Sequence, residues 1–301
     1  MPTEEERAKA ALAGLPELAN LNAPLVRMGG LTNIVFQVGE YVLRLPGEGT
    51  EEYIDRANEA AAAHEAARAG VSPEVIHADA ETGIMVSRFV AGAATMTPEG
   101  FRTRAGSPAR AGAAFARLHR SGAAFPAQFE LFAMIEDYLG ILSTKDVALP
   151  AGYHDVVAEA AVVRQALDRN PAPSVACHCD PLCENFLDTD ERMWIVDWEY
   201  SGMNDPMWDL GDLSVEGEFD DAQDIEMLTA YFGGPAPAQD HARMVIHKAM
   251  CDLLWTLWGL IQLANNNPAE DFRAYADGRF ARCKALMATP EFARHLSVLA
   301  A

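Results

Sequence analysis

The pattern of hydrophobic and polar positions divides the chain into a strand-rich first part and a longer helical part. In the first part, short runs of β-branched and aromatic residues alternate with glycine and proline, as is typical of antiparallel strands. An alanine-rich helix over 58–69, which Gly70 ends, lies among them, and an opening helix is expected over 3–20. The expected strands are 25–28, 34–38, 41–45, 75–78 and 84–90.

From Thr97 onward the helical period dominates. The exception is 175–199, where β-prone runs at 175–178, 185–188 and 193–197 predict a loop and a hairpin inserted among helices. The expected helices are 113–119, 131–142, 155–168, 222–232, 239–264 and 268–287.

The change of pattern near 88–95 is the best candidate for a boundary between two lobes. We expect a small lobe at residues 1–90 and a larger lobe at residues 91–301. The predicted fold is α+β, with an antiparallel sheet and a helix in the small lobe and mainly helices in the large one. This is the two-lobe plan of protein-kinase-like folds, and the plan alone says little about function.

The composition narrows the classes of function. The chain has 301 residues, and 23 Lys and Arg against 44 Asp and Glu give a formal charge of −21. Such a chain is a poor candidate for nucleic-acid binding, which depends on clustered cations. The start lacks the basic and apolar regions of a secretory signal, and the longest apolar stretch, 253–264, is too short to span a membrane. The 5 cysteines suit reduced thiols, so we expect a cytoplasmic protein without membrane insertion.

The candidate chemistry lies in the segment 178–199. Phosphoryl transfer from a nucleotide needs a carboxylate that accepts the proton of the attacking hydroxyl, and oxygen ligands for Mg²⁺. Asp180 fits the first need, and Asn185 and Asp197 fit the second. Taken singly, each could equally be a turn residue or a helix cap. Their combination has the spacing of a kinase catalytic loop and its metal-binding Asp.

These motifs carry a resemblance to a known family. The segment 178–185 follows the pattern His-x-Asp-x-x-x-x-Asn, and 196–200 reads Val-Asp-Trp-Glu-Tyr. Together with 201–210 they resemble the choline/ethanolamine kinases, within the aminoglycoside-phosphotransferase and protein-kinase-like superfamily, and bacterial choline kinases in particular. Traces of the resemblance extend from Gly29 to Phe280.

The resemblance implies an ATP- and Mg²⁺-dependent kinase that phosphorylates the hydroxyl of choline to give phosphocholine. In that reaction Asp180 would accept the hydroxyl proton, and Asn185, Asp197 and Glu199 would hold Mg²⁺. His178 is interpreted as a histidine that braces the catalytic loop rather than as the base.

The small lobe offers residues for the phosphates of the nucleotide. Gly30 and Asn33 lie in a glycine-containing turn, although a glycine pair before a strand is more often a simple hairpin. None of the four lysines lies on the expected sheet, which leaves Arg44 as the cation in the position of a kinase lysine. Glu59, on the following helix, could pair with it, or could be a solvated helix charge.

Two further observations concern the nucleotide. In the resembled family the hinge between the lobes binds adenine through its backbone, which here implies Ser87 and Phe89. The sequence contains no Gly-x-x-x-x-Gly-Lys-[Ser/Thr] motif, which argues against a P-loop site.

The acceptor should be recognised by aromatic residues if it is a quaternary ammonium compound. Trp255 and Trp258 are three residues apart and share a helix face, and with Tyr275 and the acidic Glu216 they could form a cage. The other interpretation is ordinary core packing of an apolar helix, but the resemblance includes this region and favours the cage. Alternatives to Glu216 are Asp209 and Asp212.

Other interpretations stay open. The acceptor could be ethanolamine, thiamine or an aminoglycoside, although an aminoglycoside would need more carboxylates and fewer aromatic residues. A nucleotide-binding sensor without activity is the alternative outside the enzymes, and the presence of all three catalytic residues argues against it. The cysteines beside His178 lack the second pair typical of a structural zinc site, and His119 is assigned no role. The sequence does not indicate an oligomeric state.

Overall fold

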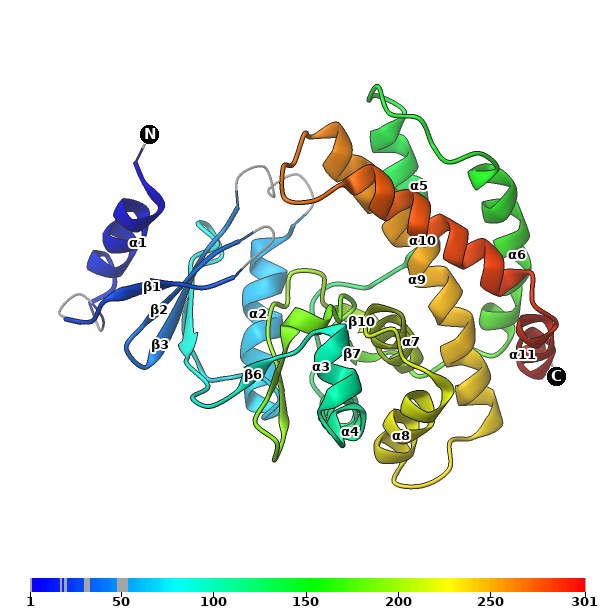
Figure 1. Cartoon of the computed structure of the whole chain (residues 1–301), viewed down its shortest axis with the longest axis horizontal. Coiled ribbons are helices and arrows are strands. Elements are labelled where there is room, and N and C mark those ends of the chain that lie inside the picture. The colour runs from blue at the N-terminus through cyan, green and yellow to red at the C-terminus, as the bar shows by residue number, and fades with distance from the viewer. Residues whose placement is uncertain (1, 17, 19–20, 30–32, 48–53, 301) are drawn as a thin grey trace.

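The structure is a computed structural model and describes residues 2–16, 18, 21–29, 33–47 and 54–300. A small lobe built on an antiparallel sheet lies beside a larger, mainly helical lobe (Figure 1). The predicted α+β, two-lobe architecture is therefore confirmed. The division of the chain at residue 90 stays a prediction, and the last strand of the small-lobe sheet ends at Arg88.

The small-lobe sheet has five antiparallel strands in the order β1-β2-β3-β5-β4. Gly39 joins β2 to β3 with φ of +61°, a backbone conformation that favours glycine. Alternate side chains such as Phe36 and Leu43 point inward, where they pack with Ala8 of the opening helix. The strands are β1 (Leu25–Arg27), β2 (Ile34–Val38), β3 (Tyr41–Leu45), β4 (Val75–Ala78) and β5 (Met85–Arg88).

Two helices belong to the small lobe. α1 (Glu4–Ala13) is shorter than the predicted 3–20, because the chain leaves the helix at Gly14. α2 (Arg56–Arg68) begins two residues before the predicted start, because the Asp55 side chain caps its first turn. The predicted end of α2 is confirmed, since Gly70 follows it with φ of +71°.

The large lobe is organised around the long helix α9 (Ala238–Ala264), against which α5, α7, α10 and α11 pack (Figure 1). The predicted helices all form, with α5 at the predicted bounds and the others with shifted ends. Helices α3, α7 and α11 were not predicted. The remaining helices are α3 (Pro98–Thr103), α4 (Ser107–His119), α5 (Leu131–Leu142), α6 (Tyr153–Arg169), α7 (Pro206–Glu216), α8 (Asp221–Phe232), α10 (Phe272–Met287) and α11 (Pro290–Ala300).

Helix α9 corrects one estimate made from the sequence. By length and composition it could cross a membrane, whereas the apolar stretch alone had looked too short. However, 83% of its apolar window is buried inside the protein. This is how the core helix of a folded domain behaves, because its apolar surface is already covered by neighbouring helices.

Short strands hold the predicted catalytic segment. β7 (Val175–Cys177) pairs with β10 (Gly202–Asn204), and β8 (Phe186–Asp188) pairs with both β6 (Ala94–Thr95) and β9 (Met193–Ile195). In β10, Gly202 lies so close to a neighbouring segment that a Cβ would be 3.2 Å from the Ala127 carbonyl oxygen. These pairings bring the loop after β7 and the loop after β9 next to each other, since Val196 N–H donates to the Asn185 carbonyl (2.9 Å).

Candidate active site

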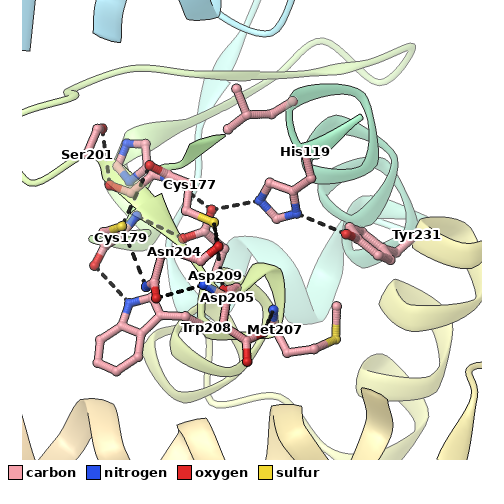
Figure 2. A network of polar contacts seen from close by, with 12 residues as sticks. His119, Cys177, Cys179, Ser201, Asn204, Asp205, Met207, Trp208, Asp209 and Tyr231 are labelled. Carbon is pink, nitrogen blue, oxygen red and sulfur yellow. Dashed lines mark hydrogen bonds and ion pairs between the residues drawn. The ribbon is translucent and has the colours of Figure 1, made fainter. Parts of the chain in front are cut away.

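The loop after β7 is held by its backbone. The Asp209 carboxylate accepts hydrogen bonds from His178 N–H and Cys179 N–H, both at 2.8 Å (Figure 2). The Trp208 indole donates to the Cys179 carbonyl (3.0 Å). Cys179 has φ of +68°, an unfavourable conformation for a residue with a side chain, which these contacts maintain. The carboxylate at position 209 is therefore a loop anchor rather than a free charge.

His119 also binds the Asp209 carboxylate. The expectation from the sequence that His119 has no special role was wrong. Its Nε2 is hydrogen-bonded to Asp209 Oδ2 and its Nδ1 to the Tyr231 hydroxyl, each at 3.0 Å (Figure 2). All three side chains are buried. A histidine at a helix end carries no local sign of such a network, because its two partners lie 90 and 112 residues away along the chain.

Asp180 follows this anchored segment. Asn185 donates its side-chain amide to the Asp180 carbonyl oxygen (3.1 Å), which fixes the two predicted residues relative to each other. Burial raises the pKa of Asp180 well above its usual value, and the negative charges of Asp212 and Glu216 add to the effect. A carboxylate in such surroundings has a greater affinity for protons than a free one, as the base in phosphoryl transfer requires.

His178 occupies the bracing position expected from the sequence. Its ring is fully buried, with Nε2 hydrogen-bonded to the Val196 carbonyl (2.9 Å) and Nδ1 accepting from Asp180 N–H (3.3 Å). Burial lowers its pKa, which favours the neutral ring. Burial raises the pKa of the nearby Cys177, Cys179 and Cys183 thiols, which favours their protonated form.

Asp197 lies across from this loop in a strained conformation, with φ of +67°. Its Oδ1 forms an ion pair with Arg44 Nη1 at 2.9 Å, which connects the two lobes. Burial raises the pKa of Asp197 to about 7, helped by the charge of Glu199 and opposed by Arg44.

Arg44 belongs to a buried group of charges that we call the inter-lobe cluster. Arg44 forms ion pairs with Glu59, as the sequence suggested, and with Glu199 (3.3 Å). The cluster also contains Arg56, which sequence reasoning missed and which contacts Glu59 (2.8 Å) and Glu199 (2.7 Å). Its three-residue spacing from Glu59 on one helix was the available signal. The members of the inter-lobe cluster are Arg44, Arg56, Glu59, Asp197 and Glu199.

The other residues predicted to bind the nucleotide are placed as follows. Asn33 is buried, donates to Glu199 Oε1 (3.0 Å) and accepts from Gly47 N–H (3.3 Å), whereas Gly30 lies outside the described residues. Ser87 lies within β5, opposite Val42 of β3.

At the end of β5 and the start of the hinge, two backbone N–H groups already form hydrogen bonds within the protein. Phe89 N–H donates to the Glu40 carbonyl (2.9 Å), and Arg88 N–H donates to the Glu74 carbonyl (2.9 Å). Val90 N–H donates to no backbone carbonyl within the described ranges. Among the described residues, the first backbone N–H after β5 that is left for a ligand is therefore that of Val90.

The oxygen groups predicted to hold Mg²⁺ suit a hard cation. Carboxylate oxygens of the predicted ligands Asp197 and Glu199 lie within 4.8 Å of each other and of Glu59, which was predicted to pair with Arg44 and not to hold the metal. Asn185 uses its amide nitrogen toward Asp180, so its amide oxygen is the atom left for a metal. Mg²⁺ takes one or two protein ligands together with phosphate oxygens and water, and Asn185 and Asp197 fit that requirement. Glu199 is less accessible, because its Oε1 already accepts hydrogen bonds from three side chains.

Beside Asp180, the predicted aromatic residues form a continuous group. The ring of Trp258 is 5.8 Å from that of Tyr275, and the ring of Trp255 is 5.4 Å from that of Tyr200. Trp258 donates its indole N–H to the Tyr200 hydroxyl (2.9 Å), which joins the two pairs. Tyr275 packs against Gly259, where a Cβ would lie only 2.6 Å from the ring. Tyr200 was present in the recognised motif, but its part in this group was not anticipated.

The charged residues of this region form a second group, which we call the C-terminal cluster. The predicted carboxylate Glu216 forms an ion pair with Arg279, a buried residue that sequence reasoning missed. Arg279 also contacts Asp252 (3.2 Å), which Arg282 approaches with two hydrogen bonds. Asp212 accepts the indole N–H of Trp255 (3.1 Å). The members of the C-terminal cluster are Asp212, Glu216, Asp252, Arg279 and Arg282.

Comparison with known proteins agrees with this geometry. The model of the phosphotransferase enzyme family matches residues 27–244. A crystal structure of a choline/ethanolamine kinase family protein from Mesorhizobium loti is 67% identical, with a TM-score of 0.92 and coverage of 99% of both chains. The choline kinase LicA from Streptococcus pneumoniae is 26% identical, with a TM-score of 0.79 and coverage of 94% of this chain and 98% of that one.

A curated relative leads to the same assignment. Protein LicA from Haemophilus influenzae (strain ATCC 51907 / DSM 11121 / KW20 / Rd) is 27% identical over 244 residues, which are 79% of this chain and 90% of that protein. The chain therefore belongs to the choline/ethanolamine kinase family, within the phosphotransferase enzyme family, and is a phosphotransferase with an alcohol as acceptor.

Proposed function

We propose that this enzyme transfers the γ-phosphoryl group of ATP to the hydroxyl of choline and produces phosphocholine and ADP. The observation that carries the proposal is the aromatic group of Tyr200, Trp255, Trp258 and Tyr275 beside the carboxylate of Asp180. A trimethylammonium group cannot donate hydrogen bonds, and aromatic faces attract it without requiring any.

The proposed chemistry uses few protein groups. Asp180 accepts the proton of the acceptor hydroxyl while that oxygen bonds to the γ-phosphorus and the bond from the γ-phosphorus to the β-phosphate oxygen breaks. Asn185 and Asp197 would hold Mg²⁺, which neutralises charge on the phosphates when it is bound. Asn185 also fixes the Asp180 backbone through the 3.1 Å hydrogen bond, so the base and the metal ligand share one rigid loop.

The nucleotide would lie between the lobes. Arg44 is the proposed contact for the phosphates, together with Asn33 and with Gly30, which is proposed from the sequence alone. Glu59 is the proposed positioning partner of Arg44, and Glu199 is proposed as a third residue near Mg²⁺. At the hinge, Ser87 and Phe89 are proposed to border the adenine. Because Phe89 N–H is already used, we place the backbone donor to adenine at Val90.

Ethanolamine is the second candidate acceptor, because the family includes kinases for both alcohols. Its primary ammonium carries three N–H groups that need oxygen acceptors, and the four aromatic residues supply few of these. Aminoglycosides are polyhydroxylated and polycationic, and the aromatic group does not suit such compounds. Thiamine carries one hydroxyl and one permanent cation, as choline does, and differs from it by its larger size, so the test below includes both. Choline is therefore the acceptor that this region favours.

The test is steady-state release of ADP with ATP, Mg²⁺ and each of choline, ethanolamine, thiamine and an aminoglycoside. We expect the highest kcat/KM with choline. A higher kcat/KM with any of the other three would refute choline as the preferred acceptor and leave the family assignment intact. Binding of ATP without turnover on any acceptor would favour an inactive sensor.

A further inference from the structure

Helix α7 carries three acidic residues on the face that meets the aromatic group. Asp209, Asp212 and Glu216 are spaced by three and four residues and so lie along one side of the helix. Asp209 is committed to the catalytic loop. This leaves Asp212 and Glu216 as the carboxylates that could meet a cationic acceptor, and their surroundings differ.

Glu216 already has a cation. Its ion pair with Arg279 is buried, since the side chains are 14% and 5% exposed. The Arg279 guanidinium also lies 4.6 Å from the centre of the Tyr275 ring. An ammonium group that approached Glu216 would therefore meet the fixed positive charge of Arg279 at the same place, which opposes binding.

Among the described residues Asp212 forms no ion pair, and the positive charge of Arg279 reaches it only without direct contact, lowering its pKa. The residue is fully buried, its Oδ2 accepts the Trp255 indole N–H, and its Oδ1 has no hydrogen-bond partner among the described residues. Burial and the charge of Glu216 raise the pKa of Asp212 well above its usual value, and the Cys251 thiol, which donates to the Lys248 carbonyl (3.2 Å), opposes this only in part. A buried carboxylate without an ion pair is energetically costly, and an incoming ammonium group would offset that cost.

Asp212 is also close to the reacting end of the site. Among the charged neighbours that raise the pKa of Asp180, Asp212 has the largest effect. In choline and ethanolamine only two carbons separate the hydroxyl oxygen from the nitrogen. An acceptor whose hydroxyl faces Asp180 therefore has its cationic group within reach of Asp212, which comes from α7, while α9 and α10 supply the aromatic walls (Figure 1).

We infer that Asp212 is the carboxylate that faces the ammonium group of the acceptor, whereas Glu216 acts indirectly by holding Arg279 against the ring of Tyr275. This inference rests on the proposed function and names the charge partner within its acceptor site. One unpaired carboxylate suits one positive charge, so the site selects amino alcohols with a single cationic nitrogen over polycations.

The test compares choline with its uncharged carbon isostere, 3,3-dimethyl-1-butanol, in the wild type, Asp212→Asn and Glu216→Gln. Asn keeps an oxygen for the Trp255 indole, so the change removes charge and little else. Asp221→Asn, at an exposed position at the start of α8, is the matched control. The measured quantity is the ratio of kcat/KM for choline to kcat/KM for the isostere.

We expect Asp212→Asn to lower this ratio by about 30-fold or more, because a buried charge pair is lost, with little change in kcat/KM for the isostere. Glu216→Gln should keep most of the ratio even if KM rises for both alcohols. An unchanged ratio in Asp212→Asn, or an equal loss on both alcohols, would overturn the inference. So would a Glu216→Gln enzyme that no longer prefers choline, whether or not Asp212→Asn folds. A wild type that uses neither choline nor ethanolamine would instead refute the proposed function.

Discussion

The inter-lobe cluster and the C-terminal cluster have the same composition and a different arrangement. Each contains three carboxylates and two arginines, so each has a formal excess of one negative charge. In the inter-lobe cluster every carboxylate contacts an arginine, and the excess charge is shared. In the C-terminal cluster the arginines form ion pairs with Glu216 and Asp252, whereas Asp212 accepts a hydrogen bond from the Trp255 indole.

This difference fits two kinds of ligand. Carboxylates that share two arginines suit phosphates accompanied by a metal ion. The arginines can contact the negative phosphate oxygens, and the carboxylates can contact the positive metal ion at the same place. A localised carboxylate beside aromatic rings suits a single organic cation. The same number of charges can therefore serve two recognition tasks, depending on which of them are paired.

Asp180 lies between the two clusters, and its replacement should have the largest effect. In Asp180→Asn we expect kcat to fall by about 10³-fold, because the proton of the hydroxyl loses its acceptor. Binding of ATP and of choline, measured separately by calorimetry, should change little. A variant that keeps more than a tenth of the wild-type kcat would show that the base lies elsewhere.

The pairing within the inter-lobe cluster predicts a large loss of stability in Arg44→Ala. The change leaves Glu59 and Glu199 buried with less compensation, which costs about 3–5 kcal/mol in the free energy of unfolding. Chemical denaturation would measure it. Arg27→Ala, at a half-exposed ion pair with Glu4, is the control, with an expected cost of about 0–1 kcal/mol. Equal costs for the two variants would contradict the importance of the cluster.

The aromatic side of the C-terminal cluster predicts a selective change in Trp258→Leu. Loss of one cation–π contact of about 0.5–2 kcal/mol corresponds to a rise of about 2- to 30-fold in KM for choline, with KM for ATP unchanged. Trp194→Leu removes a tryptophan that stacks on Arg192 instead, and serves as the control. If Trp258→Leu changed KM for ATP as much as KM for choline, the two sites would not be separate.

The raised pKa of Asp197 predicts that the affinity for Mg²⁺ depends on pH. Burial brings this pKa to about 7, and Mg²⁺ must compete with a proton for the carboxylate below that pH. The apparent dissociation constant for Mg²⁺, measured by calorimetry, should fall about tenfold per pH unit between pH 5 and 7 and level off above. A flat profile, or the same profile in Asp197→Asn, would contradict this.

The smallest effect is expected for the loop anchor that lies outside both clusters. Tyr231→Phe removes the hydrogen bond to His119 and should cost about 1 kcal/mol in the free energy of unfolding. Thermal unfolding would measure the change. A loss greater than that of Arg44→Ala would mean that this network, rather than the inter-lobe cluster, dominates stability.

Much of the fold could be predicted from local patterns. Helix 131–142 was found at its observed bounds because its apolar period is regular. Helix α7 was missed because it carries the buried Asp209 and Asp212, so its sequence lacks a clear apolar stripe, although Asp205 and Pro206 are a helix-start signal. Strand β10 has three residues, too few to form a pattern.

For the candidate site, the motif residues and the pairing of Arg44 with Glu59 could be predicted, and the other partners could not. Asp180, Asn185 and Asp197 stand in a recognisable spacing, whereas Arg56 and Arg279 meet their acidic partners across 143 and 63 residues of sequence. Such pairing depends on how the elements pack. The sequence could therefore suggest Glu216 as the acceptor carboxylate, but not that Arg279 already neutralises it.

The central claim is phosphoryl transfer to choline, and identification of the product tests it most directly. The purified enzyme would be incubated with ATP, Mg²⁺ and choline, and the mixture followed by phosphorus NMR and mass spectrometry. We predict that phosphocholine and ADP form in equal amounts. ADP accompanied only by inorganic phosphate, or no consumption of ATP, would contradict the account.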